Sequence, residues 1–128
     1  MTIEATWLDD TKRAIVYTFT PGWTWTEFTQ NNKTVSEMLD TVNYKVDIIL
    51  DFTVRTVPPP NALSNFRRIA KASHPNRGRI ILVGARMLFH TIAGQFVRLA
   101  SKLSQEILTV DTLEAACQLV DARRQDAN

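Results

Sequence analysis

Apolar and polar residues alternate near the start of the chain, and this alternation predicts two strands. Ile3, Ala5 and Trp7 alternate with polar neighbours, and a run of β-branched and aromatic residues at 14–19 follows after a short polar segment. A period of two is typical of strands that bury one face. We therefore expect the chain to begin with a β-hairpin.

A helical pattern follows the hairpin. Pro21 and Gly22 interrupt the second strand, and Thr24 with Glu27 three positions later has the capping-box spacing of a helix start. Apolar residues then recur at helical spacing to about residue 42, although residues 29–33 are weakly helical. The sequence therefore predicts a first helix that begins near Thr24 and extends to about residue 42.

The two tryptophans at this helix start have two interpretations. Trp23 precedes the Thr24 cap, so it suits a hydrophobic staple that packs on Phe28. An exposed pair of Trp23 and Trp25 would instead mark a site for a protein partner, since tryptophan is enriched in interface cores. The staple is our expectation.

Residues 46–85 have the pattern of a βαβ unit. Residues 46–52 alternate, and residues 80–83 are apolar at every position, as in a central strand that is covered on both faces. Between them, three prolines at 58–60 impose an extended approach, and Asn61 suits the N-cap of a helix that ends before residue 74. Parallel strands need a crossover of this length, so the fold class is α/β.

The rest of the chain predicts a helix at about 86–103, a strand at 107–110 and a final helix after Asp111 and Thr112. The element order is then ββαβαβαβα. A chain of 128 residues fits one domain, which we assign to residues 1–128. We expect a mixed five-stranded sheet with an N-terminal hairpin and helices packed on it. The final helix should turn the following residues inward: Leu113, Ala116, Cys117, Leu119 and Val120.

Composition narrows the class of protein. No apolar run reaches the roughly 18 residues of a membrane span, and the first residues have neither the basic nor the apolar region of an export signal. The single cysteine, Cys117, leaves no partner for an internal disulfide. We expect a cytoplasmic protein without stable membrane insertion.

The element order resembles the STAS-like domains of bacterial anti-sigma factor antagonists over nearly the whole chain. Residues 48–53, Ile-Ile-Leu-Asp-Phe-Thr, look like the family's apolar strand that ends in an aspartate, and residues 110–116 look like its final strand-to-helix junction. The resemblance implies a non-enzymatic regulatory or protein-interaction domain. Those domains carry an Asp-Ser-Ser-Gly loop whose serine is phosphorylated, whereas residues 59–62 here read Pro-Pro-Asn-Ala. The phosphoswitch therefore does not carry over, and Ser64 is a displaced candidate that also suits an ordinary helix start.

Charge is distributed unevenly along the chain. Residues 1–51 contain four Lys or Arg and eight Asp or Glu, whereas residues 52–105 contain nine Lys or Arg and no Asp or Glu. The basic middle suggests a docking surface for an acidic protein partner, or else a solvated face that nearby acidic helices neutralise. Nucleic acid is disfavoured because no reading motif is present. The candidate partner-binding residues lie in and before the second helix: Asn61, Ser64, Arg67, Arg68 and Lys71.

Few residues suggest catalysis or a bound metal. His74 and His90 have no acidic residue nearby in sequence, and Cys117 has no activating base or cation beside it. Asp47 and Asp51 share one face of a strand at a separation of roughly 13 Å, which is too long for a carboxylate pair. We expect Asp51 to cap loop amides and Asp47 to meet solvent. No enzyme activity, metal site or cofactor is predicted.

A second function remains open beside the interaction domain. Ligands of α/β proteins often bind at the carboxyl ends of the strands, where Asp51, Thr53 and Arg55 could hold a small anionic or lipidic molecule. A homodimer is also open, because one face of strand 46–52 is incompletely apolar and the acidic ends could meet another copy's basic middle. Retention of a small molecule or of an acidic partner on purification separates the two functions.

Overall fold

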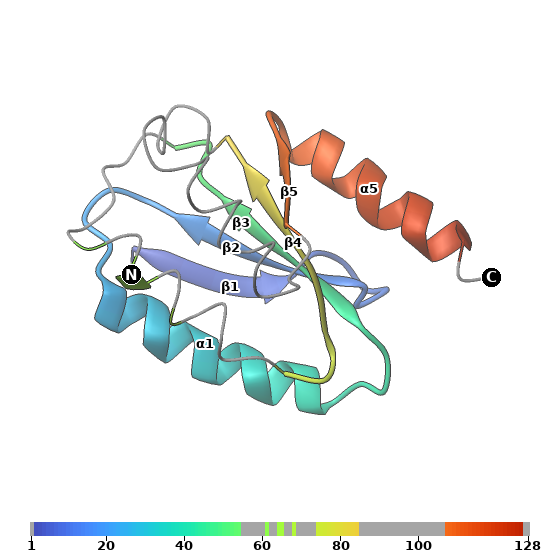
Figure 1. Ribbon diagram of the computed structural model, residues 1–128, viewed down its shortest axis with the longest axis horizontal. Helices are drawn as coiled ribbons and strands as arrows, with labels where there is room; N and C mark the ends of the chain where they lie inside the picture. The colour runs from blue at the N-terminus through green and yellow to red at the C-terminus, as the bar shows by residue number, and fades with distance from the viewer. Residues whose placement is uncertain are drawn as a thin grey trace.

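A computed structural model places five strands in one sheet with helices on both faces (Figure 1). The structure describes residues 2–54, 61, 64–65, 68, 74–84 and 107–126. Strands follow the chain order β1-β2-β3-β4-β5 across the sheet. The α/β class and the mixed five-stranded sheet predicted from the sequence are therefore confirmed.

The N-terminal hairpin forms as expected. Strand β1 (Ile3–Trp7) pairs antiparallel with β2 (Ala14–Phe19). In the connecting turn, the Asp9 carboxylate accepts from the Thr11 backbone N–H, and Lys12 takes a positive φ of 55°. A local side-chain acceptor of this kind is the usual way in which Asp stabilises a tight turn.

The remaining strands run parallel to β2. They are β3 (Val46–Asp51), β4 (Arg77–Val83) and β5 (Ile107–Val110). Of the predicted second helix, Ser64, Asn65 and Arg68 are described and are helical. The predicted helix at 86–103, with His90, lies outside the described residues.

Helix α1 (Trp25–Asp40) begins at the predicted cap and runs without a break through residues 29–33. The Thr24 hydroxyl accepts from the Glu27 backbone N–H at 3.2 Å, which is one half of the capping box. The other half is replaced, because the Glu27 carboxylate accepts from the backbone N–H and hydroxyl of Thr2. Glu27 thus fastens the start of α1 to the residue before β1.

Trp23 forms the expected staple. It is buried, and its ring centroid lies 6.1 Å from that of Phe28 and 4.9 Å from that of Phe19. Trp25 packs edge-on against Trp23 at 4.8 Å. The pair therefore belongs to an aromatic cluster at the carboxyl ends of β2 and β3, and the interpretation as an exposed pair is wrong.

Two cores lie on opposite faces of the sheet (Figure 1). The α1 face is the side covered by α1, where large residues of β2, β3 and β4 such as Tyr17, Phe19 and Leu50 are buried. The α5 face is covered by α5 (Leu113–Asp126), whose Ala116 and Val120 pack on smaller aliphatic residues of the same strands. The buried apolar residues of the strands thus alternate between the two cores.

Two predictions about the α5 face are wrong. Leu113 was expected to face inward but remains 36% exposed at the first turn of α5. Asp47 was expected to meet solvent but is 2% exposed, and every residue of β3 is buried. The incompletely apolar face of β3 is therefore covered within the chain, which removes that argument for a homodimer.

A bulge between β3 and β4 explains the burial of Asp47. Val46 pairs with Arg77 and Ile48 pairs with Ile80, so Gly78 and Arg79 both lie opposite Asp47. The Asp47 carboxylate accepts from the Arg79 backbone N–H at 3.0 Å and from its guanidinium at 2.9 Å. The same guanidinium donates to the Leu119 carbonyl of α5 at 3.1 Å. One buried ion pair thus joins two strands and a helix.

Candidate functional site

The residues predicted to bind a protein partner are only partly described. Asn61, Ser64 and Arg68 are exposed, while Arg67 and Lys71 lie outside the described residues. The Asn61 carbonyl accepts from the backbone and side-chain amides of Asn65, whose side-chain oxygen accepts from Arg68 at 2.8 Å. Three of the five candidates are therefore accessible.

The residues predicted at the carboxyl end of β3 serve the local backbone. The buried Asp51 carboxylate accepts from the Thr53 backbone N–H at 2.9 Å and from its hydroxyl at 2.7 Å. Gly84 passes so close to Thr53 that a Cβ on Gly84 would lie 3.3 Å from the Thr53 backbone. Asp51 thus caps loop amides, as expected, and Arg55 lies outside the described residues.

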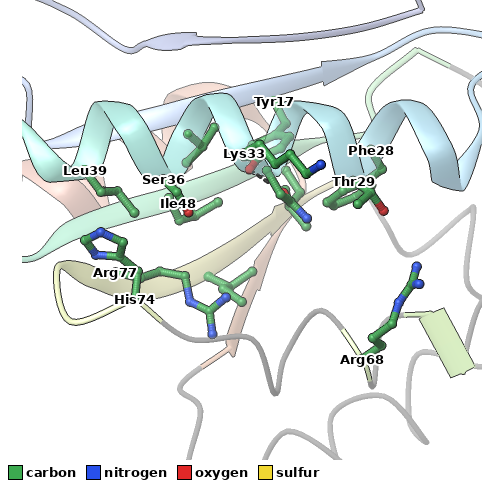
Figure 2. A pocket seen from close by; sticks show the side chains of 14 residues that line it. Tyr17, Phe28, Thr29, Lys33, Ser36, Leu39, Ile48, Arg68, His74 and Arg77 are labelled. Carbon is green, nitrogen blue, oxygen red and sulfur yellow. Dashed lines mark hydrogen bonds between the residues drawn. The ribbon is translucent and has the colours of Figure 1, made fainter.

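A pocket of about 350 Å³ lies instead along the flank of α1, at the side of the helix that faces β3 and β4 (Figure 2). Helix α1 and strands β3 and β4 supply most of the pocket wall, and Arg68 and His74 are lining residues from outside these three elements. Its described lining residues are Tyr17, Phe28, Thr29, Asn32, Lys33, Val35, Ser36, Leu39, Ile48, Leu50, Arg68, His74, Arg77 and Ile80.

The inner wall of the pocket is apolar. Alternating residues of β3, Ile48 and Leu50, turn toward α1 together with Ile80 of β4. Helix α1 adds Val35 and Leu39, which belong to its buried stripe. A pocket with this wall favours the hydrocarbon part of a ligand, since apolar surface gains free energy when it leaves water.

A neutral hydrogen bond crosses the wall near its middle. The Tyr17 hydroxyl donates to the side-chain oxygen of Asn32 at 2.6 Å. Burial raises the pKa of Tyr17 well above its ordinary value, and the nearby Arg77 offsets this only in part. Tyr17 therefore stays a neutral donor at physiological pH.

Four basic side chains line the pocket: Lys33, Arg68, His74 and Arg77. The described lining residues include no Asp or Glu. Desolvation lowers the pKa of Arg77, but arginine stays protonated in proteins because its ordinary pKa is so high. The described rim therefore has positive charge beside an apolar wall.

His74 closes the end of the pocket at the C-terminus of α1. Its Nε2 lies 2.8 Å from an Asp40 carboxylate oxygen, and its Nδ1 accepts from the Asn76 backbone N–H at 3.0 Å. A carboxylate only accepts and a backbone N–H only donates, so this arrangement fits the neutral ring with its proton on Nε2. The Asn76 side chain caps α1 by donating to the Leu39 and Val42 carbonyls.

Sequence reasoning missed this pocket, although α1 contains a signal for it. Thr29, Asn32 and Ser36 recur at helical spacing beside the apolar stripe, and all three line the pocket. A polar row at the border of a buried stripe is also typical of an ordinary amphipathic helix. The polar row on α1 can be interpreted as part of a pocket only because the structure shows that β4 and Arg68 line the same pocket.

Two further observations concern metals and membranes. The described part of the chain contains no group of three His, Cys, Asp or Glu residues placed to hold a metal ion. Among the described helices, none combines the length and the apolar character needed to span a bilayer.

Comparison with known proteins yields no relative: no protein-family model, curated protein or solved structure matches the chain.

Proposed function

We propose that this chain is a non-enzymatic binding domain for a small anionic molecule with an apolar body, held in the pocket beside α1. The observation that supports this most directly is the combination in one pocket of an apolar wall with the cationic side chains Lys33, Arg68 and Arg77, while the described lining residues include no Asp or Glu. Its volume of about 350 Å³ falls in the range typical of small-molecule sites, roughly 300–1,000 Å³.

The second hypothesis from the sequence was a small anionic or lipidic ligand at the carboxyl ends of the strands. The present proposal keeps this class of ligand but places it beside α1. At the carboxyl end of β3, the Asp51 carboxylate already accepts hydrogen bonds from the Thr53 backbone N–H and hydroxyl. The pocket, in contrast, offers Arg77 and Lys33 beside Ile48 and Leu50. Positive charge next to apolar surface fits the two parts of an amphiphilic anion.

The lining supports binding in preference to catalysis. Tyr17 and His74 are two described lining residues whose side chains could transfer protons. The Tyr17 hydroxyl is bonded to Asn32, and burial moves its pKa away from neutrality. Both ring nitrogens of His74 are engaged, with Asp40 and with the Asn76 backbone. A general acid or base works best with a pKa near the working pH and a free path to its substrate.

A STAS-like interaction domain is the second candidate. It is supported by the exposure of Asn61, Ser64 and Arg68. Arg68 also lines the pocket, so the same arginine could serve an acidic partner or a bound anion. Replacing Arg68 with glutamate should abolish capture of an acidic protein partner if docking uses this surface, and unchanged capture would contradict it.

Calorimetric titration of the full chain with decanoate tests the proposed function. Decanoate has 12 non-hydrogen atoms, and a volume of 350 Å³ holds roughly that number at about 30 Å³ each. We expect one decanoate per chain, with binding at least about tenfold weaker for decyltrimethylammonium, because its charge repels the basic rim.

Two substitutions in α1 localise the binding. Ser36→Phe should fill the pocket and abolish decanoate binding, since Ser36 lines it. Glu37→Phe is the matched control, because Glu37 is the next residue of α1, is exposed and is not among the lining residues. Circular dichroism confirms that both variants fold. Equal binding by the two variants, or no decanoate binding by the parent chain, would overturn the proposal.

A further inference from the structure

The pocket beside α1 brings together apolar and neutral polar side chains. The sheet contributes apolar side chains, among them Ile48 and Leu50 of β3. Helix α1 contributes the neutral polar row of Thr29, Asn32 and Ser36. A ligand in this pocket therefore meets hydrocarbon on the sheet side and also polar groups of the helix.

The members of the polar row differ in the hydrogen bonds that they already make. The Thr29 hydroxyl donates to the Trp25 carbonyl at 2.9 Å. Ser36 is exposed, so water can satisfy its hydroxyl. Asn32 is half-buried, and its side-chain oxygen accepts from the Tyr17 hydroxyl at 2.6 Å (Figure 2). Asn32 is thus the member of the row whose side chain is both shielded from water and held by a buried neighbour.

The hydrogen bond to Tyr17 decides which group Asn32 offers to the pocket. Burial raises the pKa of Tyr17, so its hydroxyl keeps its proton and donates at physiological pH. A carboxamide has one oxygen, which accepts, and one NH2 group, which donates. Since the oxygen is held by Tyr17, the NH2 group is left for the pocket, and none of the described residues accepts from it.

From this arrangement we infer that the ligand has an oxygen on its body that accepts from the Asn32 NH2 group, so that it is an oxo or hydroxy carboxylic acid. This inference rests on the proposed function, because it specifies the ligand of the same pocket. A half-buried donor gains a partner from such an oxygen, whereas a plain alkyl chain leaves it unpaired. Asn32 then selects among acids of equal length, and Tyr17 positions Asn32.

Titration of the full chain with a series of oxodecanoates, compared with decanoate, tests the inference. Each member of the series has one ketone, placed at successive carbons in the middle of the chain. If the pocket offers the ligand body no donor, every ketone loses water without gaining a partner and binds more weakly than decanoate. With Asn32 as the donor, at least one member should bind about threefold or more tightly than decanoate.

Two substitutions of Asn32 remove the donor in different ways. Asn32→Leu should lose the advantage of the ketone and bind decanoate within about threefold of the parent. Asn32→Asp also lacks the NH2 group but keeps an acceptor for Tyr17, and its charge weakens both acids alike. The ratio of the two affinities is therefore the readout, and in both variants it should favour decanoate. Gln30→Leu is the matched control that should keep the parent ratio, since Gln30 is an exposed amide of α1 outside the pocket lining.

Infrared difference spectra give a direct readout of the hydrogen bond. The tightest oxodecanoate is isotope-labelled at its ketone carbon, so its band is separated from the protein bands. A ketone that accepts a hydrogen bond absorbs at lower frequency than one in apolar surroundings. The bound ketone should therefore absorb at lower frequency in the parent and in Gln30→Leu than in Asn32→Leu.

The outcomes separate the two proposals. If no oxodecanoate binds more tightly than decanoate, the oxygenated ligand is overturned and the anion pocket stays in place. An advantage or a low-frequency band that survives both substitutions of Asn32 overturns the inference in the same way. Failure of decanoate and of the whole series to bind overturns the proposed function itself.

Discussion

Under α1 the sheet carries aromatic and large aliphatic side chains beside a pocket, whereas under α5 it carries small aliphatic side chains around an ion pair. The polar groups buried on the two faces differ in kind. Tyr17 and Asn32 form a neutral pair on the α1 face, and Asp47 and Arg79 form a charged pair on the α5 face. The same strands thus support two surfaces with different chemistry.

The buried polar groups constrain the two faces differently. The Arg79 guanidinium binds both a β3 carboxylate and the Leu119 carbonyl, so it fixes α5 to the sheet. A buried charge tolerates little rearrangement, since any loss of its partner leaves it unsolvated. On the α1 face, a neutral hydrogen bond and basic side chains that are exposed or half-buried line an open pocket. This contrast supports the proposed binding function of the α1 face.

The largest expected effect is on the α5 face. Asp47→Ala leaves the Arg79 guanidinium, which is only 15% exposed, without its carboxylate, so the free energy of unfolding should fall by about 3–5 kcal/mol. Asp40→Ala removes the partner of His74 at an exposed position, and its cost should stay within about 1 kcal/mol. Urea denaturation of both variants measures the two values. Similar losses would show that the Asp47 pair does not fasten the fold.

Adjacent residues of β3 provide the second test of the comparison. Ile49 is fully buried on the α5 face, and Leu50 lines the pocket on the α1 face. Truncation to Ala costs about 2–5 kcal/mol in protein cores, and the cost rises with the cavity it creates. Ile49→Ala should fall in the upper part of that range and Leu50→Ala in the lower part, since Leu50 already lacks contacts on its pocket side. Urea denaturation that shows the reverse order would contradict an open pocket.

Local chemistry in the sequence predicts much of this fold. Strands at 14–19, 46–51 and 107–110 follow from period-two alternation and β-branched residues. The start of α1 follows from Thr24, because a side-chain cap acts within one helical turn. The capping of a loop amide by Asp51 follows from the position of this residue at the end of β3. Each of these features depends on residues that are close in sequence.

Two features that the sequence did not predict, the burial of Asp47 and the pocket, depend on residues that are far apart in sequence. The burial of Asp47 requires Arg79, 32 residues away, and a bulge that brings the two together. The pocket requires α1, β3 and β4 to be assembled before its wall exists. Pairing across such distances is set by tertiary packing, which local periodicity does not encode. The proposed function therefore keeps the ligand class of one sequence hypothesis and places the ligand beside α1, not at the carboxyl ends of the strands.

A smaller effect is expected from the neutral pair of the α1 face. Tyr17→Phe removes the hydrogen bond to Asn32 and should cost about 0.5–1.5 kcal/mol at neutral pH. Burial raises the pKa of Tyr17 in the folded state, so its stabilising contribution is complete below the unfolded pKa of about 10 and declines as the pH rises above it. Above pH 10 the parent should therefore lose stability more steeply than Tyr17→Phe. Parallel pH dependences in urea denaturation would contradict the burial of the hydroxyl.

The smallest effect concerns charge beside α5, where Cys117 reports on the local field. Desolvation raises the pKa of the thiol, and the carboxylates of Asp121, Asp9 and Glu114 raise it further. Because the thiolate is the reactive form, Cys117 should be alkylated more slowly at pH 8 than cysteine in a short peptide. The delay should be greater for iodoacetate than for iodoacetamide, since acidic neighbours repel the anionic reagent. Asp121→Asn should bring the two rates closer, whereas Glu37→Gln on α1 should leave them unchanged. A thiol that reacts equally fast with both reagents would show that the anion-repelling character of the α5 side, and with it the electrostatic contrast to the basic pocket, is absent.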